Sequence, residues 1–153
     1  MYKAVRKAIN DKDAEAIKRL AVDEMEGGAD ILDVNTGPAT AEPVKVMGWL
    51  VETIHSAVDI PLAIDSPKPE VVEAGLKAHK KGKPMINSTT AETDKLTRLL
   101  DLALEHNASL IGLSMDEHGV PRDVNKKSEL ALQIVAMAME KGLVRACHDC
   151  SEG

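Results

Sequence analysis

Carboxylate and carboxamide side chains lie at or near the ends of three apolar runs in this sequence. Asp33 and Asn35 belong to the first run, Asp65 ends the second, and Asn87 lies near the end of the third. A carboxylate accepts hydrogen bonds, whereas a carboxamide both donates and accepts them. Gathered in one place, these four side chains would suit a flat heterocycle that carries an amino group, ring N–H donors and a carbonyl.

Each of these residues also has a structural interpretation. An Asp or Asn that follows a strand often caps the next helix or forms a turn. The neighbouring Ser66, Thr89 and Thr90 could equally begin the following helices. The same kind of ending on three consecutive runs nevertheless favours a shared site for a polar heterocycle.

The elements that must position these side chains follow a regular alternation. Apolar runs and helical patterns recur about every 25 to 30 residues, as in βα units. The predicted strands are 31–35, 60–65, 85–88 and 109–115, and the predicted helices are 13–26, 43–58, 70–79, 90–106 and 126–141. Strands joined by helices lie parallel and in order, because right-handed crossovers place them side by side.

This arrangement predicts where the polar residues gather. Ligands of parallel α/β folds bind at the carboxyl ends of the strands, which is where Asp65 and Asn87 stand. The period of two along a strand puts Asp33 and Asn35 on one face and Leu32 on the other. Because neighbouring strands are about 4.8 Å apart, we expect all four polar side chains to line one small rim.

The predicted fold class is α/β, and the predicted architecture is a partial (β/α)8 TIM barrel of about four βα units. A closed barrel needs eight units and about 250 residues, whereas this sequence has 153. We expect 1–142 to form the barrel segment and 143–153 to form a C-terminal tail of unclear structure. An open doubly wound sheet is the alternative, but the sequence lacks a G-x-G-x-x-G fingerprint.

Composition excludes several classes of function. The formal charge of −6 and the aromatic content of 1% argue against nucleic-acid binding, which needs a basic surface and often stacking side chains. No run approaches the roughly 18 apolar residues of a membrane span, and the first ten residues hold no signal-peptide pattern. We therefore expect a cytoplasmic protein without a membrane partner and with an aliphatic core.

Cysteine and histidine provide no convincing metal site. Cys147 and Cys150 enclose His148 near the end of the sequence, but three such ligands leave a tetrahedral zinc site incomplete. We expect no bound metal, and the role of the two cysteines stays open. A reduced tail is the simpler interpretation in a reducing compartment.

The other histidines have simple structural interpretations. His55, His79 and His106 fall within or at the ends of predicted helices, so we expect solvated or C-terminal helical residues rather than ligands. His118 lies in the polar loop 116–125. An exposed loop histidine is expected there, with a substrate or partner contact as the alternative.

Three ordered motifs resemble those of the pterin-binding barrels. They are Leu-Asp-Val-Asn-Thr-Gly-Pro at 32–38, Ile-Asp-Ser at 64–66 with Glu-Ala-Gly-Leu-Lys at 73–77, and Met-Ile-Asn-Ser-Thr-Thr-Ala-Glu at 85–92. Within that superfamily they look most like methyltransferases that act on methyltetrahydrofolate and a corrinoid protein. They are also similar to the folate domain of cobalamin-dependent methionine synthase. The likeness covers about 3–142.

The resemblance implies a TIM barrel, usually a homodimer, that holds a pterin at its strand ends. Asp65 and Asn87 match the family residues that hydrogen-bond the pterin ring, and Asp33 and Asn35 occupy second-strand positions of the same site. The implied reaction moves the N5 methyl group of methyltetrahydrofolate to the cobalt of a corrinoid, or cobalamin, carried by a partner protein. Protonation of N5 or a hydrogen bond to it would assist departure of the methyl group.

The sequence departs from this family in ways that limit the prediction. The family's first strand is missing before Tyr2, and its later strands are missing after Gly142, so we expect the N5-activating residues to lie outside this chain. No catalytic residue is therefore assigned. A dihydropteroate synthase-like enzyme is one alternative. A non-catalytic half-barrel that pairs with itself or with a second chain through its sheet edges is another.

Overall fold

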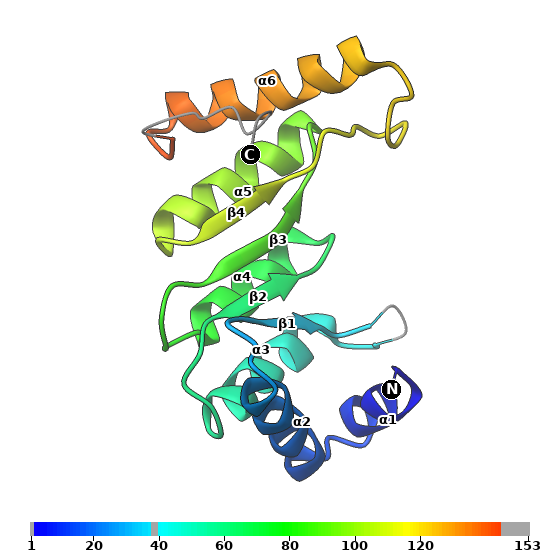
Figure 1. Ribbon diagram of the computed structural model, residues 1–153, viewed down its shortest axis with the longest axis vertical. Coiled ribbons are helices and arrows are strands. Elements are labelled where there is room, and N and C mark those ends of the chain that lie inside the picture. Colours follow the sequence, from blue (N-terminus) through cyan, green and yellow to red (C-terminus); the bar gives the residue numbers. More distant parts are fainter. Residues whose placement is uncertain (1, 38–39, 145–153) are drawn as a thin grey trace.

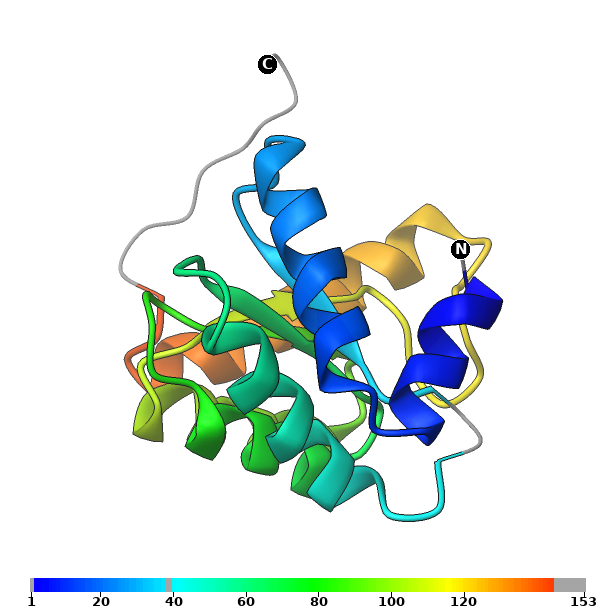
Figure 2. The same ribbon diagram turned by 90° about the horizontal axis from the view of Figure 1, so that it is seen from below.

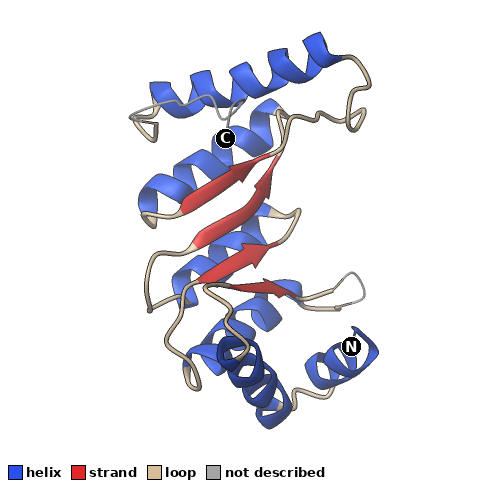
Figure 3. Cartoon of the chain, in the orientation of Figure 1, coloured by secondary structure: helices blue, strands red, loops and turns tan. Residues whose placement is uncertain are grey.

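A computed structural model describes residues 2–37 and 40–144 of the chain. These residues form one parallel sheet with the strand order β1-β2-β3-β4, and a layer of helices covers it (Figures 1 and 3). The elements in chain order are α1 (Tyr2–Asn10), α2 (Ala14–Glu26), β1 (Leu32–Asn35), α3 (Pro43–His55), β2 (Leu62–Asp65), α4 (Pro69–Ala78), β3 (Met85–Thr89), α5 (Thr93–Glu105), β4 (Ser109–Gly112) and α6 (Val124–Glu140).

The α/β fold class and the parallel strand order agree with the sequence-based prediction, and the arrangement is that of a partial TIM barrel. Two details differ. Helix α1 was not predicted. Strand β4 ends at Gly112 rather than Met115, because the chain then turns. The Leu113 N–H donates to Thr89 O, and the Ala91 N–H donates to Met115 O.

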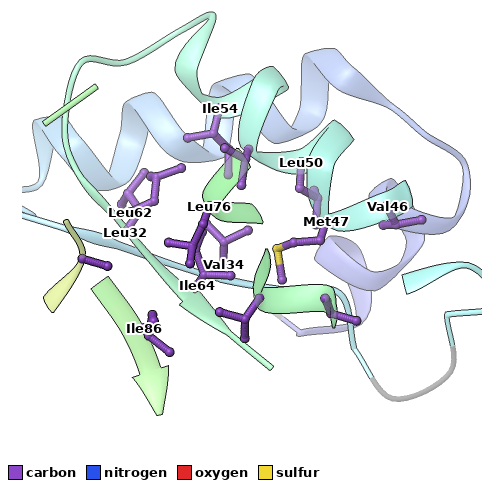
Figure 4. Close-up of a cluster of buried hydrophobic side chains, with 14 of the residues drawn as sticks. Leu32, Val34, Val46, Met47, Leu50, Ile54, Leu62, Ile64, Leu76 and Ile86 are labelled. Carbon is purple, nitrogen blue, oxygen red and sulfur yellow. The ribbon is translucent and has the colours of Figure 1, made fainter. Parts of the chain in front are cut away.

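The core forms between the sheet and the helices α3, α4 and α5, which lie together on one side of the sheet (Figure 2). Alternate strand residues, including Leu32, Val34, Ile64 and Ile86, are buried on that side. They belong to one cluster with apolar side chains of α3 and α4 (Figure 4). The period-two pattern of each strand thus sends its aliphatic residues toward the helices and its polar residues to the opposite face.

Helix α4 approaches the sheet closely because residue 75 is a glycine. A Cβ atom built at Gly75 would lie 2.7 Å from Ile64 Cγ2 and 3.0 Å from Met47 Cγ. Real Cβ atoms do not approach other atoms so closely, because interiors are close-packed. The glycine therefore sets the spacing between α4 and β2.

Three histidines lie at the carboxyl ends of helices, near the amino-terminal ends of the strands. His55 is the last residue of α3, and His79 and His106 directly follow α4 and α5. Their positions at helix ends agree with the prediction, but His55 is not solvated, since only 7% of it is exposed. Its ring packs edge to face against that of His79, with 4.6 Å between centroids.

Two further expectations concern membranes and metals. None of the helices in the described part of the chain is long and apolar enough to cross a bilayer. Residues 2–37 and 40–144 contain no group of three His, Cys, Asp or Glu side chains placed to hold a metal ion. Cys147, His148 and Cys150 lie outside the described residues.

Candidate functional site

The register of the sheet places the polar strand-end residues on one face. Asn35 pairs with Asp65, and Asp65 pairs with Asn87, so these three residues form a row across β1, β2 and β3. Asp33 precedes Asn35 by two positions and therefore faces the same way. This is the face opposite the core, and none of the helices α3, α4 and α5 lies on it (Figure 2).

The first contact in this cluster joins β1 to β2. Asn35 donates a hydrogen bond from Nδ2 to Asp65 Oδ2 at 2.6 Å. Its other side-chain atom, Oδ1, accepts one from the Gly37 N–H, also at 2.6 Å. Gly37 has a φ of +78°, a conformation that glycine adopts readily. The turn after β1 thus fixes the Asn35 amide with its N–H groups toward Asp65.

The second contact joins β3 to β1 across the intervening strand. Asn87 donates from Nδ2 to Asp33 Oδ1 at 2.9 Å. The residue of β2 beside Asp33 in the register is Ala63. Its small side chain leaves the space over which Asn87 reaches Asp33. The four residues therefore form two amide–carboxylate pairs on one rim.

These residues do not serve as helix caps. The N-cap residues of α3, α4 and α5 are Glu42, Lys68 and Glu92, and none of the three makes a side-chain capping bond. Ser66 accepts from the Lys68 N–H in the turn before α4. The capping interpretation is therefore wrong for Asp33, Asn35, Asp65 and Asn87, although the bond from Gly37 gives Asn35 a turn-forming role too.

The chain matches a family model described as "Pterin binding enzyme" over residues 3–151. It belongs to the pterin-binding enzyme family. Because that match spans nearly all of the chain and includes all three strand-end motifs, the family and the convergence of the four polar residues support each other.

Similar curated proteins point the same way. The chain is 34% identical over 141 residues to "Methylcorrinoid:tetrahydrofolate methyltransferase" of Eubacterium limosum, covering 91% of this chain and 52% of that protein. It is 30% identical over 138 residues to "Methionine synthase" of Mycobacterium leprae (strain TN), covering 87% of this chain and 11% of that protein. The chain thus spans about half the length of the first relative and a small part of the second.

The surroundings of Asp33 in this pterin-binding family member favour its protonated form. Partial burial raises the pKa of Asp33, and the nearby Asp65 charge raises it further, while the hydrogen bond from Asn87 opposes both effects. Proton uptake at the rim therefore begins more readily at Asp33 than it would for an isolated aspartate. A protonated Asp33 would also offer a hydrogen-bond donor.

One apolar side chain that the sequence analysis did not single out faces the same side of the sheet as the polar rim. Ile111 of β4 is 37% exposed. Its neighbour Gly112 lies against Ile134 of α6, so strand alternation turns Ile111 toward the uncovered face. Ile111 is apolar although its strand position points away from the helices, and this exception in the sequence could have identified it.

His118 stays apart from the rim. Its side chain is 84% exposed, and its backbone N–H donates to Asp116 Oδ1 within the loop after β4. The structure agrees with an exposed loop histidine. Among the described residues, no hydrogen bond or ion pair joins it to Asp33, Asn35, Asp65 or Asn87.

Proposed function

We propose that this chain supplies part of the pterin site of a methyltransferase that moves the N5 methyl group of methyltetrahydrofolate to the cobalt of a corrinoid protein. The observation that carries the proposal is the pair of amide–carboxylate contacts on one face, Asn35 to Asp65 and Asn87 to Asp33. The name of the Eubacterium limosum relative describes a methyltransferase that acts on a methylcorrinoid and tetrahydrofolate. The proposed reaction is the same transfer in the opposite direction.

The rim keeps enough hydrogen-bonding capacity for a pterin. After the two internal contacts, each carboxylate retains an oxygen that accepts, Asn87 retains Oδ1, and each amide retains one N–H. A pterin ring offers an amino group and a ring N–H as donors, and a carbonyl and ring nitrogens as acceptors. The free atoms of Asp33, Asp65 and Asn87 therefore complement the ring without breaking the contacts that orient them.

In the proposed transfer the pterin ring is the methyl donor, and the corrinoid of the partner protein is the methyl acceptor. The bond between N5 and the methyl carbon breaks and its electron pair stays on N5, while the reduced corrinoid of the partner protein, which acts as a Co(I) substrate, supplies the electron pair of the new bond to the methyl carbon. A proton delivered to N5 makes the ring a better leaving group. We assign the role of proton donor to residues outside this chain. The four rim residues would hold and orient the ring.

A test of the reaction uses the chain co-expressed with the rest of the barrel. Isotopically labelled methyltetrahydrofolate and a reduced corrinoid protein should give labelled corrinoid, and Asp65→Ala should slow this transfer. The competing candidate is a dihydropteroate synthase-like activity. Condensation of aminobenzoate with pterin pyrophosphate, without methyl transfer, would replace the proposed function by that one.

A homodimeric assembly and a cytoplasmic location stay predictions. Sedimentation of the assembled protein tests the first, and fractionation of cells that express it tests the second.

A further inference from the structure

The contact between Asn87 and Asp33 spans a strand to which neither residue belongs. Asp33 lies on β1 and Asn87 lies on β3, with β2 between them in the sheet. The backbones of neighbouring strands are about 4.8 Å apart, so those of β1 and β3 are about 10 Å apart. Asn87 Nδ2 nevertheless lies 2.9 Å from Asp33 Oδ1. The two side chains therefore lean toward each other above β2.

The register of the sheet identifies the residues of β2 that lie beneath this contact. Asp33 pairs with Ala63, whereas Asn87 pairs with Asp65. Paired residues of parallel strands point to the same side, so all four side chains are on the face opposite the core. The contact thus crosses β2 diagonally, between Ala63 and Asp65.

Of these two residues of β2, Ala63 controls the space beneath the contact. The Asp65 carboxylate is held in its own row, because Asp65 Oδ2 accepts a hydrogen bond from Asn35 Nδ2 at 2.6 Å. Ala63 lies one row lower, beside Asp33. Its side chain is a single methyl group, which leaves more room than any other side chain except that of glycine.

The burial of Ala63 comes from the rim face and not from the core. Only 5% of Ala63 is exposed, although the helices α3, α4 and α5 lie on the other side of the sheet (Figure 2). In the described part of the chain, Ala63 belongs to neither of the two clusters of buried apolar residues. Neighbouring side chains on the rim face therefore cover it.

We propose that Ala63 is a positioning residue, whose small side chain lets Asn87 bond to Asp33 and so sets the orientation in which the Asn87 amide meets the pterin ring. A larger residue at position 63 would place carbon atoms in the path of this contact and turn Asn87 away. The inference rests on the proposed function in naming the pterin as the ligand. The clearance above Ala63 is a property of the chain alone and is tested without a ligand.

The protonation of Asp33 reports the contact directly. Burial raises the pKa of Asp33, the hydrogen bond from Asn87 lowers it, and the charge of Asp65 raises it further. Loss of the bond from Asn87 therefore raises the pKa. Titration of the Asp33 carboxyl carbon by carbon-13 NMR, in the folded full chain, measures the change.

The test compares Ala63→Val, Asn87→Ala and the double variant. We expect Ala63→Val to raise the pKa of Asp33 as far as Asn87→Ala does, and the double variant to raise it no further, because both changes remove the same bond. An unchanged pKa in Ala63→Val would overturn the proposal. A rise that Ala63→Val repeats in full on top of Asn87→Ala would also overturn it, since the valine would then act on Asp33 without Asn87.

Ser109→Val is the matched control. Ala63 pairs with Met85, and Met85 pairs with Ser109, so Ser109 lies in the same row but two strands away from Ala63. The pKa of Asp33 should keep its wild-type value in this variant, and a rise equal to that in Ala63→Val would refute the role of Ala63. Circular dichroism checks the folding of each variant. If valine at position 63 prevents folding, Ala63→Cys under reducing conditions adds a single sulfur atom and should give a smaller rise, whereas no rise would refute the proposal.

The ligand is tested separately, in the completed barrel. We expect Ala63→Val to weaken the binding of methyltetrahydrofolate in a calorimetric titration about as much as Asn87→Ala does, and the double variant to bind no more weakly than either. An unchanged affinity together with a raised pKa of Asp33 would overturn the pterin site of the proposed function. An unchanged pKa would instead overturn the positioning role of Ala63.

Discussion

At the scale of single residues, the proposed pterin site holds its polar atoms in a fixed orientation before a ligand binds. The Asn35 amide is fixed by Asp65 and by the Gly37 N–H, and the Asn87 amide is fixed by Asp33. Orientation of this kind reduces the entropy that binding would otherwise cost. Removing one partner leaves the other polar group without its bond, and the ligand with one fewer partner.

We therefore expect Asp65→Ala and Asn87→Ala each to weaken pterin binding in the completed barrel by about 1 to 3 kcal/mol. Calorimetric titration with methyltetrahydrofolate measures the change. Asp30→Ala, at an exposed carboxylate before the amino end of β1, should leave the affinity unaltered. Wild-type affinity in both rim variants would remove these residues from the site.

At the scale of elements, close packing between α4 and β2 holds the middle of the sheet. We expect Gly75→Ala to lower the free energy of unfolding by about 1 to 3 kcal/mol, because its Cβ would overlap Ile64 and Met47. Gly48→Ala in α3 is the control, since a Cβ there meets nothing within 4 Å. Alanine should stabilise that helix by up to about 1 kcal/mol. Equal effects in urea titrations would contradict the packing argument.

The histidine pair links the ends of α3 and α4 to the start of β2. His79 Nε2 accepts a hydrogen bond from the Leu62 N–H, and His55 Nδ1 accepts one from the Lys80 N–H, each at 3.3 Å. Burial and then the nearby His55 lower the pKa of His79 to about 4. Burial also lowers the pKa of His55, with Lys81 adding to the effect and Asp59 opposing it.

These shifts predict acid-sensitive stability. A histidine whose pKa is lower in the folded chain takes up protons first in the unfolded chain, so stability falls as the pH drops from about 6.5 toward 4. His79→Gln, which keeps an acceptor near Leu62, should remove about 1 to 2 kcal/mol of this pH dependence, a value reduced for partial exposure. His118→Gln should not alter it. Urea titrations at pH 7 and pH 5 would refute the idea if both variants matched the wild type.

At the scale of the whole molecule, the described residues leave the proposed pterin site open on one side. The rim lies on a face that α3, α4 and α5 leave uncovered (Figure 2). Hydrogen bonds from such an open face to a ligand compete with water and contribute little net free energy. In the closed (β/α)8 barrel that we propose, further strands would enclose the ring and supply the remaining contacts.

We therefore expect the isolated chain to bind methyltetrahydrofolate weakly or not at all. Calorimetric titration of the folded chain alone measures this directly, and the same titration of a completed barrel should show tighter binding. Micromolar affinity of the chain by itself would show that β1, β2 and β3 form a sufficient site.

Local sequence patterns were enough to predict the alternation of elements, the parallel order of the strands and the residues at the strand ends. These features depend on local periodicity and on short right-handed connections, which neighbouring residues specify. The tertiary structure alone decided that Asn87 reaches Asp33 across Ala63 and that His55 is buried against His79. Such contacts join residues far apart in the chain, and they depend on strand register, side-chain size and helix spacing, which local patterns do not fix.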